Sequence, residues 1–279
     1  MLLPAGILML VFLLIPIGLT FLLAFTNARL ISPVPAKFIG VDNFIRLFES
    51  STFWKSLTNT IVFAVVIVPV QSGLALILAV LVNAKVRGTN IFRTIYFLPV
   101  VTSMVVVSML WMFMYQQEGL INSVLARLGI IGPDWLGDPN TALFALIIMS
   151  AWQAMGFHMV IWLSGLQTIS GDLYEAASLD GASPWQQFWN VTWPGLKQTR
   201  TFILITITIS AFSLFTQVNI MTQGGPLDST STVVFQAVRT GFQQQQTGYA
   251  SAISLVFFVL VLAVSLVQRY LTRDKDLGK

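Results

Sequence analysis

Residues 56–84 read SLTNTIVFAVVIVPVQSGLALILAVLVNA and contain no Asp, Glu, Lys or Arg. An ionised side chain at the centre of a membrane helix costs roughly 2.5–3.5 kcal/mol on insertion scales, so charge-free runs are the places where a chain enters lipid. A helix needs ~20 apolar residues to cross the hydrocarbon core, and residues 56–84 exceed that length. The stretch therefore predicts a membrane-spanning helix.

The rest of the chain repeats this pattern. Hydrophobic residues make up 56% of the sequence and charged residues 9%, against roughly 25% charged in an average soluble domain. A soluble fold of this length could not cover its surface with so few charges. Every charged residue lies outside a set of windows that are each long enough to span: 1–28, 56–84, 94–117, 139–171, 201–227 and 240–268.

We therefore predict an all-α membrane protein with six transmembrane helices, because runs this long indicate helices rather than short barrel strands. Six spans leave both termini on one side. That side carries the larger share of Lys and Arg, many close to span ends, which is typical of the cytoplasmic face. The predicted organisation is a first transmembrane helix with an external loop (1–56), a core of five transmembrane helices (57–271) and a cytoplasmic tail (272–279). The predicted helices lie near residues 3–26, 57–83, 94–115, 141–164, 201–222 and 249–271.

The connection between the fourth and fifth spans has the most organised loop sequence. Residues 168–199 read TISGDLYEAASLDGASPWQQFWNVTWPGLKQT. Ser170 can cap a short helix whose first turn carries Asp172 and Glu175, where acidic groups suit the positive end of the helix dipole. Gly181 supplies a left-handed stop. The first half of the loop therefore predicts a short capped helix.

A second short helix follows with its own start signals. Ser183, Pro184 at the first helical position and Gln186 form a capping box. Pro194 and Gly195 end the unit before the fifth span. Its aromatic side chains fall on one face by their i, i+3, i+4 spacing: Trp185, Phe188 and Trp189. The loop at 170–195 thus predicts two short helices at the membrane surface, too small to fold without support from the spans or a partner.

This loop resembles the EAA motif of permeases of ATP-binding-cassette (ABC) importers. That motif has Glu-Ala-Ala, three residues, Gly, nine residues, an aliphatic residue, one residue and Leu-Pro, and Trp193 stands here where Leu is usual. Asp180 before the glycine and Ala182 after it resemble the carbohydrate-type branch of the family. The matching residues of the motif are Glu175, Ala176, Ala177, Gly181, Val191 and Pro194.

Other segments resemble the same branch, in the expected order along nearly the whole chain: FIGVDNFIRLF at 38–48, FRTIYFLP at 92–99 and TQGGPLDSTSTVVFQAVRTGF at 222–242. The resemblance implies a type I ABC importer transmembrane domain in a bacterial inner membrane. It also implies that the loop at 170–195 is a coupling helix, which docks on a cytoplasmic ATPase subunit. An interfacial loop that anchors its aromatic side chains at the lipid headgroups is the alternative.

The implied assembly contains a homologous second permease, a pair of ABC ATPase subunits, an external solute-binding protein and the surrounding lipid. The implied solute is a sugar, a related polyol or glycerol phosphate. A permease for amino acids, peptides or polyamines is a second transport interpretation. A non-transport membrane scaffold and an intramembrane enzyme are the alternatives from other classes, although a scaffold needs no capped cytoplasmic helix pair.

The sequence lacks the residue patterns expected for ATP hydrolysis and for metal binding. No G-x-x-x-x-G-K-[ST] stretch occurs, so ATP hydrolysis is expected in a separate subunit. The chain has no Cys and a single His, His158, which we expect to be hydrogen-bonded within the helix bundle rather than to bind a metal. We therefore expect no catalytic residue, cofactor or metal in this chain, and no nucleic-acid partner.

The translocation path is predicted from polar residues inside spans. Thr206, Ser210, Ser213 and Gln217 recur at i, i+4, i+7 and i+11 and form one polar stripe on the fifth span, and Asn219 lies near its outer end. Amides pair with hydroxyl groups and aromatic rings stack on sugar faces, but helix–helix packing enriches polar and small residues as well. Both interpretations stay open at this point. The candidate path residues are Gln153, Phe157, Gln217 and Asn219.

Two outer segments, 27–56 and 223–248, are the predicted contacts for the solute-binding protein. The second is rich in Gly, Pro, Ser and Gln and predicts an exposed loop with a surface helix at 231–240. A solvated linker explains the same composition.

Overall fold

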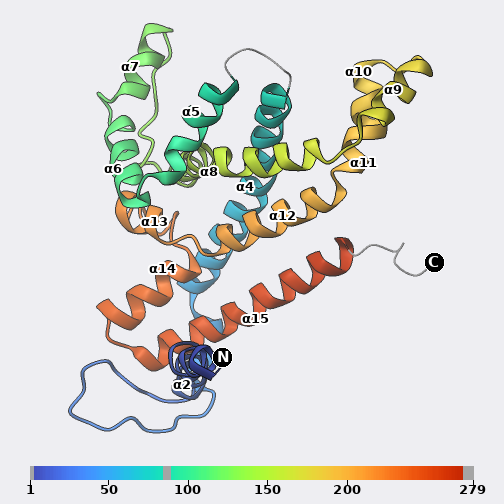
Figure 1. Ribbon diagram of the computed structural model, residues 1–279. Helices are drawn as coiled ribbons and strands as arrows, with labels where there is room; N and C mark the ends of the chain where they lie inside the picture. Colours follow the sequence, from blue (N-terminus) through green and yellow to red (C-terminus); the bar gives the residue numbers. More distant parts are fainter. Residues whose placement is uncertain (1–2, 84–88, 273–279) are drawn as a thin grey trace.

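The computed structural model describes residues 3–83 and 89–272, and these residues are helical or lie in loops, apart from one isolated bridge between Thr26 and Phe38. Figure 1 shows the helices in chain order. They are α1 (Leu3–Met9), η1 (Leu10–Leu14), α2 (Ile15–Leu23), α3 (Asp42–Glu49), α4 (Ser51–Asn83), α5 (Thr89–Val101), α6 (Met104–Met114), α7 (Leu120–Arg127), α8 (Ala142–Gln167), α9 (Gly171–Leu179), α10 (Pro184–Gln187), η2 (Phe188–Thr192), α11 (Trp193–Gly195), α12 (Lys197–Phe212), α13 (Thr216–Met221), α14 (Val233–Val238), η3 (Arg239–Gln243) and α15 (Thr247–Thr272).

The predicted spans are confirmed in number when a bent helix pair is counted as one. Within the described residues, five helical segments are long and apolar enough to cross a membrane, and the pair α5–α6 makes a sixth. The five are Leu3–Leu23, Ser51–Asn83, Ala142–Gln167, Lys197–Met221 and Thr247–Tyr270. The fold class is therefore an all-α, multi-pass membrane protein.

The third span differs from the single helix predicted at 94–115. Helix α5 ends at Val101 and α6 begins at Met104, with a bend of 99° between them. Pro99 has no N–H for the helical ladder, and its ring crowds the preceding turn. The Thr102 hydroxyl donates to the Leu98 carbonyl, which competes with backbone pairing at the break. The continuous helix was a wrong prediction, because the apolar composition outweighed the proline signal.

The fifth span is also interrupted, so the continuous polar stripe predicted along it is wrong. Helix α12 stops at Phe212 and α13 starts at Thr216. The hydroxyl of Thr232, far along the chain, donates to the Leu214 carbonyl at 2.8 Å. Because a buried carbonyl needs a partner, this long-range bond makes the interruption tolerable at membrane depth.

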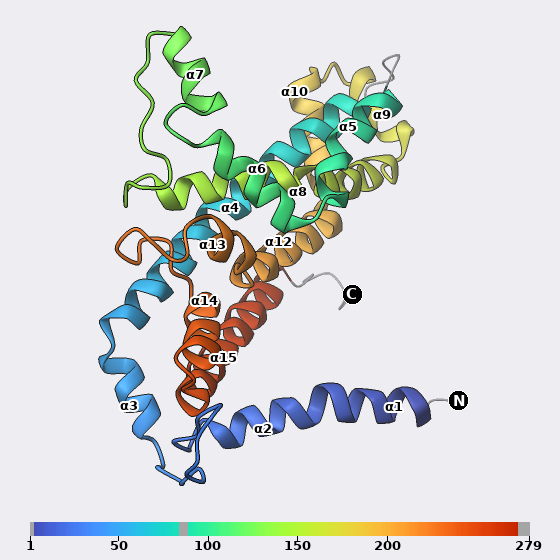
Figure 2. The ribbon, with the colours of Figure 1, turned by 90° about the vertical axis from the view of Figure 1, so that its left-hand side faces the viewer.

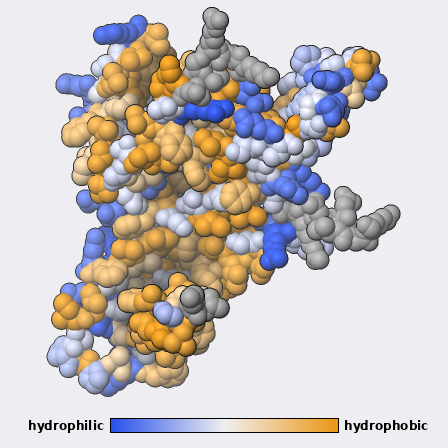
Figure 3. Space-filling view, in the orientation of Figure 1, coloured by the Kyte–Doolittle hydropathy of each residue, from blue (hydrophilic) through white to orange (hydrophobic). Residues whose placement is uncertain are grey.

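Helix α8 forms the centre of the bundle, and the first span lies at its edge. Of the spanning windows, that of α8 is 56% buried and that of Leu3–Leu23 is 0% buried. Figure 2 shows α1 and α2 extending away from the remaining helices, and Figure 3 shows their apolar surface facing outward. An added Cβ at Gly156 of α8 would collide with the Tyr96 carbonyl of α5. Close approach at small residues is typical of helix packing in membranes.

The connections gather at opposite ends of the bundle. Figure 1 places α9 and α10 beyond one end of α8 and α12, on the same side as the C-terminal end of α15. Helices α7, α13 and α14 lie toward the other side. This separation matches the alternating direction of successive spans and puts the loop at 170–195 away from the segment 223–248.

Candidate coupling loop and translocation cavity

The first short helix of the loop, α9, has the predicted caps. The Ser170 hydroxyl accepts from the Asp172 N–H at 3.3 Å. Gly181 has a left-handed φ of 77°, and the Ala182 N–H closes the turn on the Ala177 carbonyl at 2.9 Å. An L-residue with a side chain rarely adopts this φ, so glycine is required here. The helix therefore ends in a defined turn that sets the direction of α10.

The second short helix has the predicted capping box. The Ser183 N–H donates to Gln186 Oε1 at 2.7 Å, and the Gln186 N–H donates to Ser183 Oγ at 3.4 Å. The helix continues through η2 and α11 to Gly195, next to the turn at Leu196 that leads into α12. The aromatic face is confirmed and is larger than predicted, with neighbouring ring centroids 5.3–6.3 Å apart: Trp185, Phe188, Trp189 and Trp193.

Two contacts that the sequence analysis missed join the short helices. The Tyr174 hydroxyl lies 2.9 Å from the Thr192 hydroxyl, and Gln187 Nε2 donates to Ser178 Oγ at 2.9 Å. These pairs are far apart in sequence, and no periodicity relates them. They make the loop a braced unit rather than two independent helices.

The outward face of α9 is exposed along its whole length. None of its residues is buried, and the Leu179 side chain at its end is 89% exposed. Glu175, Ala176 and Asp180 lie on this exposed surface, and Ala177 and Ala182 are half-buried. An apolar and acidic surface with small side chains, on a braced unit, suits close contact with another protein.

A cavity of about 190 Å³ lies in the bundle between α4, α6, α8, α12 and α13. Its apolar wall comes from five residues in two spans and the start of α6, together with alanines of α8 and α12. Ser210 is exposed, so the cavity opens on that side. The polar side chains that line it are Gln71, Ser150, Gln153, His158, Ser210 and Gln217.

Hydrogen bonds hold several of these side chains in place. The His158 Nδ1 lies 3.0 Å from Gln71 Nε2 and 3.0 Å from the Ala154 carbonyl. One tautomer accepts from the Gln71 amide and the other donates to the carbonyl, so this nitrogen is engaged in either case. Gln153 Nε2 donates to the Pro99 carbonyl at 3.3 Å, next to the break between α5 and α6.

The predicted path residues separate into two groups. Gln153 and Gln217 line the cavity. Phe157 and Asn219 do not: the Phe157 ring packs edge-on against His158 at 5.2 Å, and Asn219 lies on α13 away from the lining. His158 is hydrogen-bonded into the bundle, as predicted, and it also faces the cavity. Gln71 was missed, although a single amide in the apolar stretch 61–82 was a signal.

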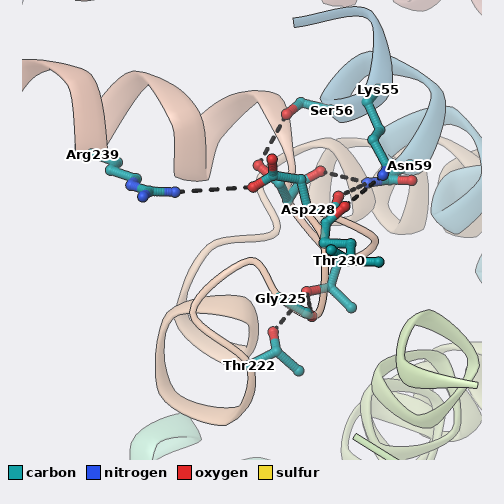
Figure 4. Close-up of polar contacts among 10 residues, drawn as sticks. Lys55, Ser56, Asn59, Thr222, Gly225, Asp228, Thr230 and Arg239 are labelled. Carbon is teal, nitrogen blue, oxygen red and sulfur yellow. Dashed lines mark hydrogen bonds and ion pairs between the residues drawn. The ribbon is translucent and has the colours of Figure 1, made fainter. Parts of the chain in front are cut away.

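A polar pocket of about 370 Å³ lies where the outer segments 27–56 and 223–248 meet, with Arg46, Glu49 and Arg239 in its lining. Figure 4 shows how the second segment is tied to α4. The Asn59 amide donates to the carbonyls of Asp228 and Ser231 at 2.8 and 3.0 Å. A helix is present where a surface helix was predicted, as α14 followed by η3, but its exposed position was a wrong prediction, because Val233, Phe235 and Gln236 are buried.

Within the described ranges, no group of three or more His, Cys, Asp or Glu side chains is placed to hold a metal ion. The polar residues of the cavity instead supply neutral hydrogen-bonding groups. The arrangement can bind hydroxyl groups by paired donors and acceptors.

Comparisons with known proteins identify the family. Residues 71–276 match the family model of the binding-protein-dependent transport system inner membrane component. The chain is 37% identical over 98% of its length to the lactose transport system permease protein of Rhizobium radiobacter, covering 92% of that protein. It is 35% identical over 96% of its length to the trehalose/maltose transport system permease protein of Thermococcus litoralis, covering 90% of it.

The fold is similar to a chain in the crystal structure of a bacterial alginate ABC transporter in complex with an alginate pentasaccharide-bound periplasmic protein. The TM-score is 0.87 at 24% identity, covering 98% of this chain and 92% of that one. The likeness shows that the two chains share a fold. The chain belongs to the family of binding-protein-dependent transport system inner membrane components, the permease subunits of ABC importers.

Proposed function

We propose that this chain forms part of the path by which a sugar or related polyol is imported across the bacterial inner membrane, driven by ATP hydrolysis in a separate subunit. The names of its relatives, which transport lactose and trehalose or maltose, support the solute class. The cavity of amides, hydroxyls and one imidazole supports a solute that is recognised by hydrogen bonds.

The observation that carries the mechanism is the braced, exposed unit α9–α10 at one end of the bundle. In the proposed assembly this end is cytoplasmic, and α9 docks on an ABC ATPase subunit. Because Gly181, the two caps and the Tyr174–Thr192 contact hold the unit together, a push on α9 is transmitted to α12 and α8 instead of being absorbed by a flexible loop. The residues proposed for docking are Glu175, Ala176, Ala177, Asp180, Gly181, Ala182 and Pro194.

The remaining partners follow from the same arrangement. A homologous second permease would complete the open side of the cavity near Ser210, and membrane lipid would cover the other apolar faces. The external solute-binding protein would contact the surface around Arg46 and Arg239, where the two outer segments form one polar pocket. This chain itself would need no cofactor and would catalyse no reaction.

The proposed coupling is tested with the complex reconstituted in lipid nanodiscs from both permeases, the ATPase and the binding protein. Glu175→Lys should abolish the ATP hydrolysis that the loaded binding protein stimulates, because it reverses the charge on the docking face. Glu118→Lys makes the same charge change at an exposed residue of a different loop and should leave stimulation near the wild-type value. Normal stimulation in the Glu175→Lys complex would contradict the docking role.

A further inference from the structure

The charge of the cavity lining bears on which solutes it accepts. Among the described residues that line it, none is Asp, Glu, Lys or Arg. The imidazole of His158 is engaged by Gln71 and Ala154 through its Nδ1. Every other polar group in the lining is an amide or a hydroxyl. A solute in this cavity would therefore meet no fixed positive charge.

One hydroxyl in the lining has no hydrogen-bond partner among the residues that the structure describes. Ser150 Oγ is buried, with the side chain only 7% exposed, and it makes no hydrogen bond to another group. A buried hydroxyl without a partner costs about 1–3 kcal/mol, so native proteins pair such groups with protein, water or ligand. Because Ser150 faces the cavity beside Gln153, a bound hydroxyl group would satisfy it.

The start of α6 is a competing feature, since Met104 brings a helix N-terminus to the cavity wall. A helix dipole stabilises a nearby anion by typically 0.3–1 kcal/mol. Removing a phosphate or carboxylate from water without a cationic partner costs several kcal/mol. The desolvation cost is the larger effect, so the helix end does not make this an anion site.

The cavity is small and open on one side. Its volume is about 190 Å³, and Ser210 is exposed at its rim. In the proposed assembly this chain therefore lines one wall of a larger path, and the charge of that wall bears on every solute that passes it.

We infer that this cavity selects uncharged polyhydroxylated solutes, whose hydroxyl groups are bound by Ser150, Gln153 and Gln217 with Gln71 and His158, over sugar phosphates and uronates. The inference rests on the proposed transport function and narrows its solute class. It excludes glycerol phosphate as the transported solute.

The absence of Cys in this chain allows a direct test of the charge preference. Ser150→Cys places a thiol in the cavity, and Ile131→Cys places one on an outer loop where the side chain is 98% exposed. Each reconstituted complex is treated with hydroxyethyl methanethiosulfonate, which is neutral, or sulfonatoethyl methanethiosulfonate, which is anionic. Both form a mixed disulfide and release methanesulfinate. Labelling of this chain is followed by intact mass, with and without ATP.

The rate of modification by the neutral reagent is divided by the rate for the anionic reagent at each position. This ratio should be at least about tenfold larger for the thiol at position 150 than for the thiol at position 131, since ~1.4 kcal/mol of differential desolvation gives that factor. Adding Gln153→Lys to Ser150→Cys should raise the rate of the anionic reagent severalfold. Equal relative rates for the two reagents would overturn the inference while leaving the path intact. If neither reagent reaches position 150 in any nucleotide state, the cavity is no solute path, and the proposed function fails with it.

Discussion

The loop at 170–195 and the central cavity are built in opposite ways. The caps and turns of the loop are local: the Ser170 cap, the Gly181 turn and the capping box at Ser183 each involve residues within five positions of one another. The cavity is assembled from α4, α6, α8, α12 and α13, and Gln71 meets His158 across 87 residues of sequence.

This difference separates the two tasks that we propose for the chain. The loop carries no solute-binding group, and the cavity carries no docking surface. Changes in the loop should therefore alter how ATP hydrolysis is coupled, and changes in the cavity should alter how the solute is handled. A variant that changes the coupling of ATP hydrolysis and the handling of the solute equally would contradict this separation between loop and cavity.

The largest effect is expected from Gly181→Val. A β-branched residue at φ 77° is strained by roughly 1–2 kcal/mol, and relief of that strain would turn α10 away from α9. Stimulated ATP hydrolysis by the reconstituted complex should fall by about tenfold or more. The matched control is Gly171→Ala, because Gly171 has an ordinary φ and open space around it. An unchanged Gly181→Val complex would show that the turn does not transmit motion.

A smaller and selective effect is expected from the double variant Gln153→Leu and Gln217→Leu. Two amides that line the cavity are lost, so uptake of the solute into proteoliposomes should fall severalfold, as each hydrogen bond contributes ~1 kcal/mol. ATP hydrolysis per complex should stay near wild type. Phe157→Leu with Asn219→Leu is the control, since neither residue lines the cavity. Equal loss of uptake in both double variants would show that residues lining the cavity matter no more for transport than residues outside the lining.

The smallest effect is expected from Tyr174→Phe. The variant removes the hydrogen bond to Thr192 and should loosen α9 against η2 by about 1 kcal/mol. Hydrogen exchange of the α9 backbone amides should speed up about fivefold, with uptake reduced only slightly. Tyr270→Phe, at an exposed position on α15, should leave exchange in α9 unchanged. Unaltered α9 exchange in Tyr174→Phe would mean that the loop is rigid without this brace.

The sequence supported good predictions wherever one local interaction decides the structure. Charge-free windows located the spans, and the Ser170, Ser183 and Gly181 signals located the two short helices. The bend at Thr102–Ser103 was missed because composition alone does not reveal where Pro99 breaks the helix. The interruption at Ser213–Phe215 depends on Thr232, a long-range partner that no periodicity indicates.

The cavity was predicted only in part for the same reason. Gln153 and Gln217 were found from their polarity, but Phe157 and Asn219, predicted beside them, lie outside the lining. Which polar residues in a span face inward depends on the crossing of helices, here at Gly156 against Tyr96, and that contact is not encoded in one helix.

The central claim is that the exposed surface of α9 docks on the ATPase subunit. Its most direct test places a photo-crosslinking amino acid at Leu179 in the reconstituted complex, with Ile131, a fully exposed residue on another loop, as the control position. Illumination should yield a product that mass spectrometry identifies as this chain joined to the ATPase from position 179, and none from position 131. Absence of that product at 179, with the complex intact and hydrolysing ATP, would contradict the claim.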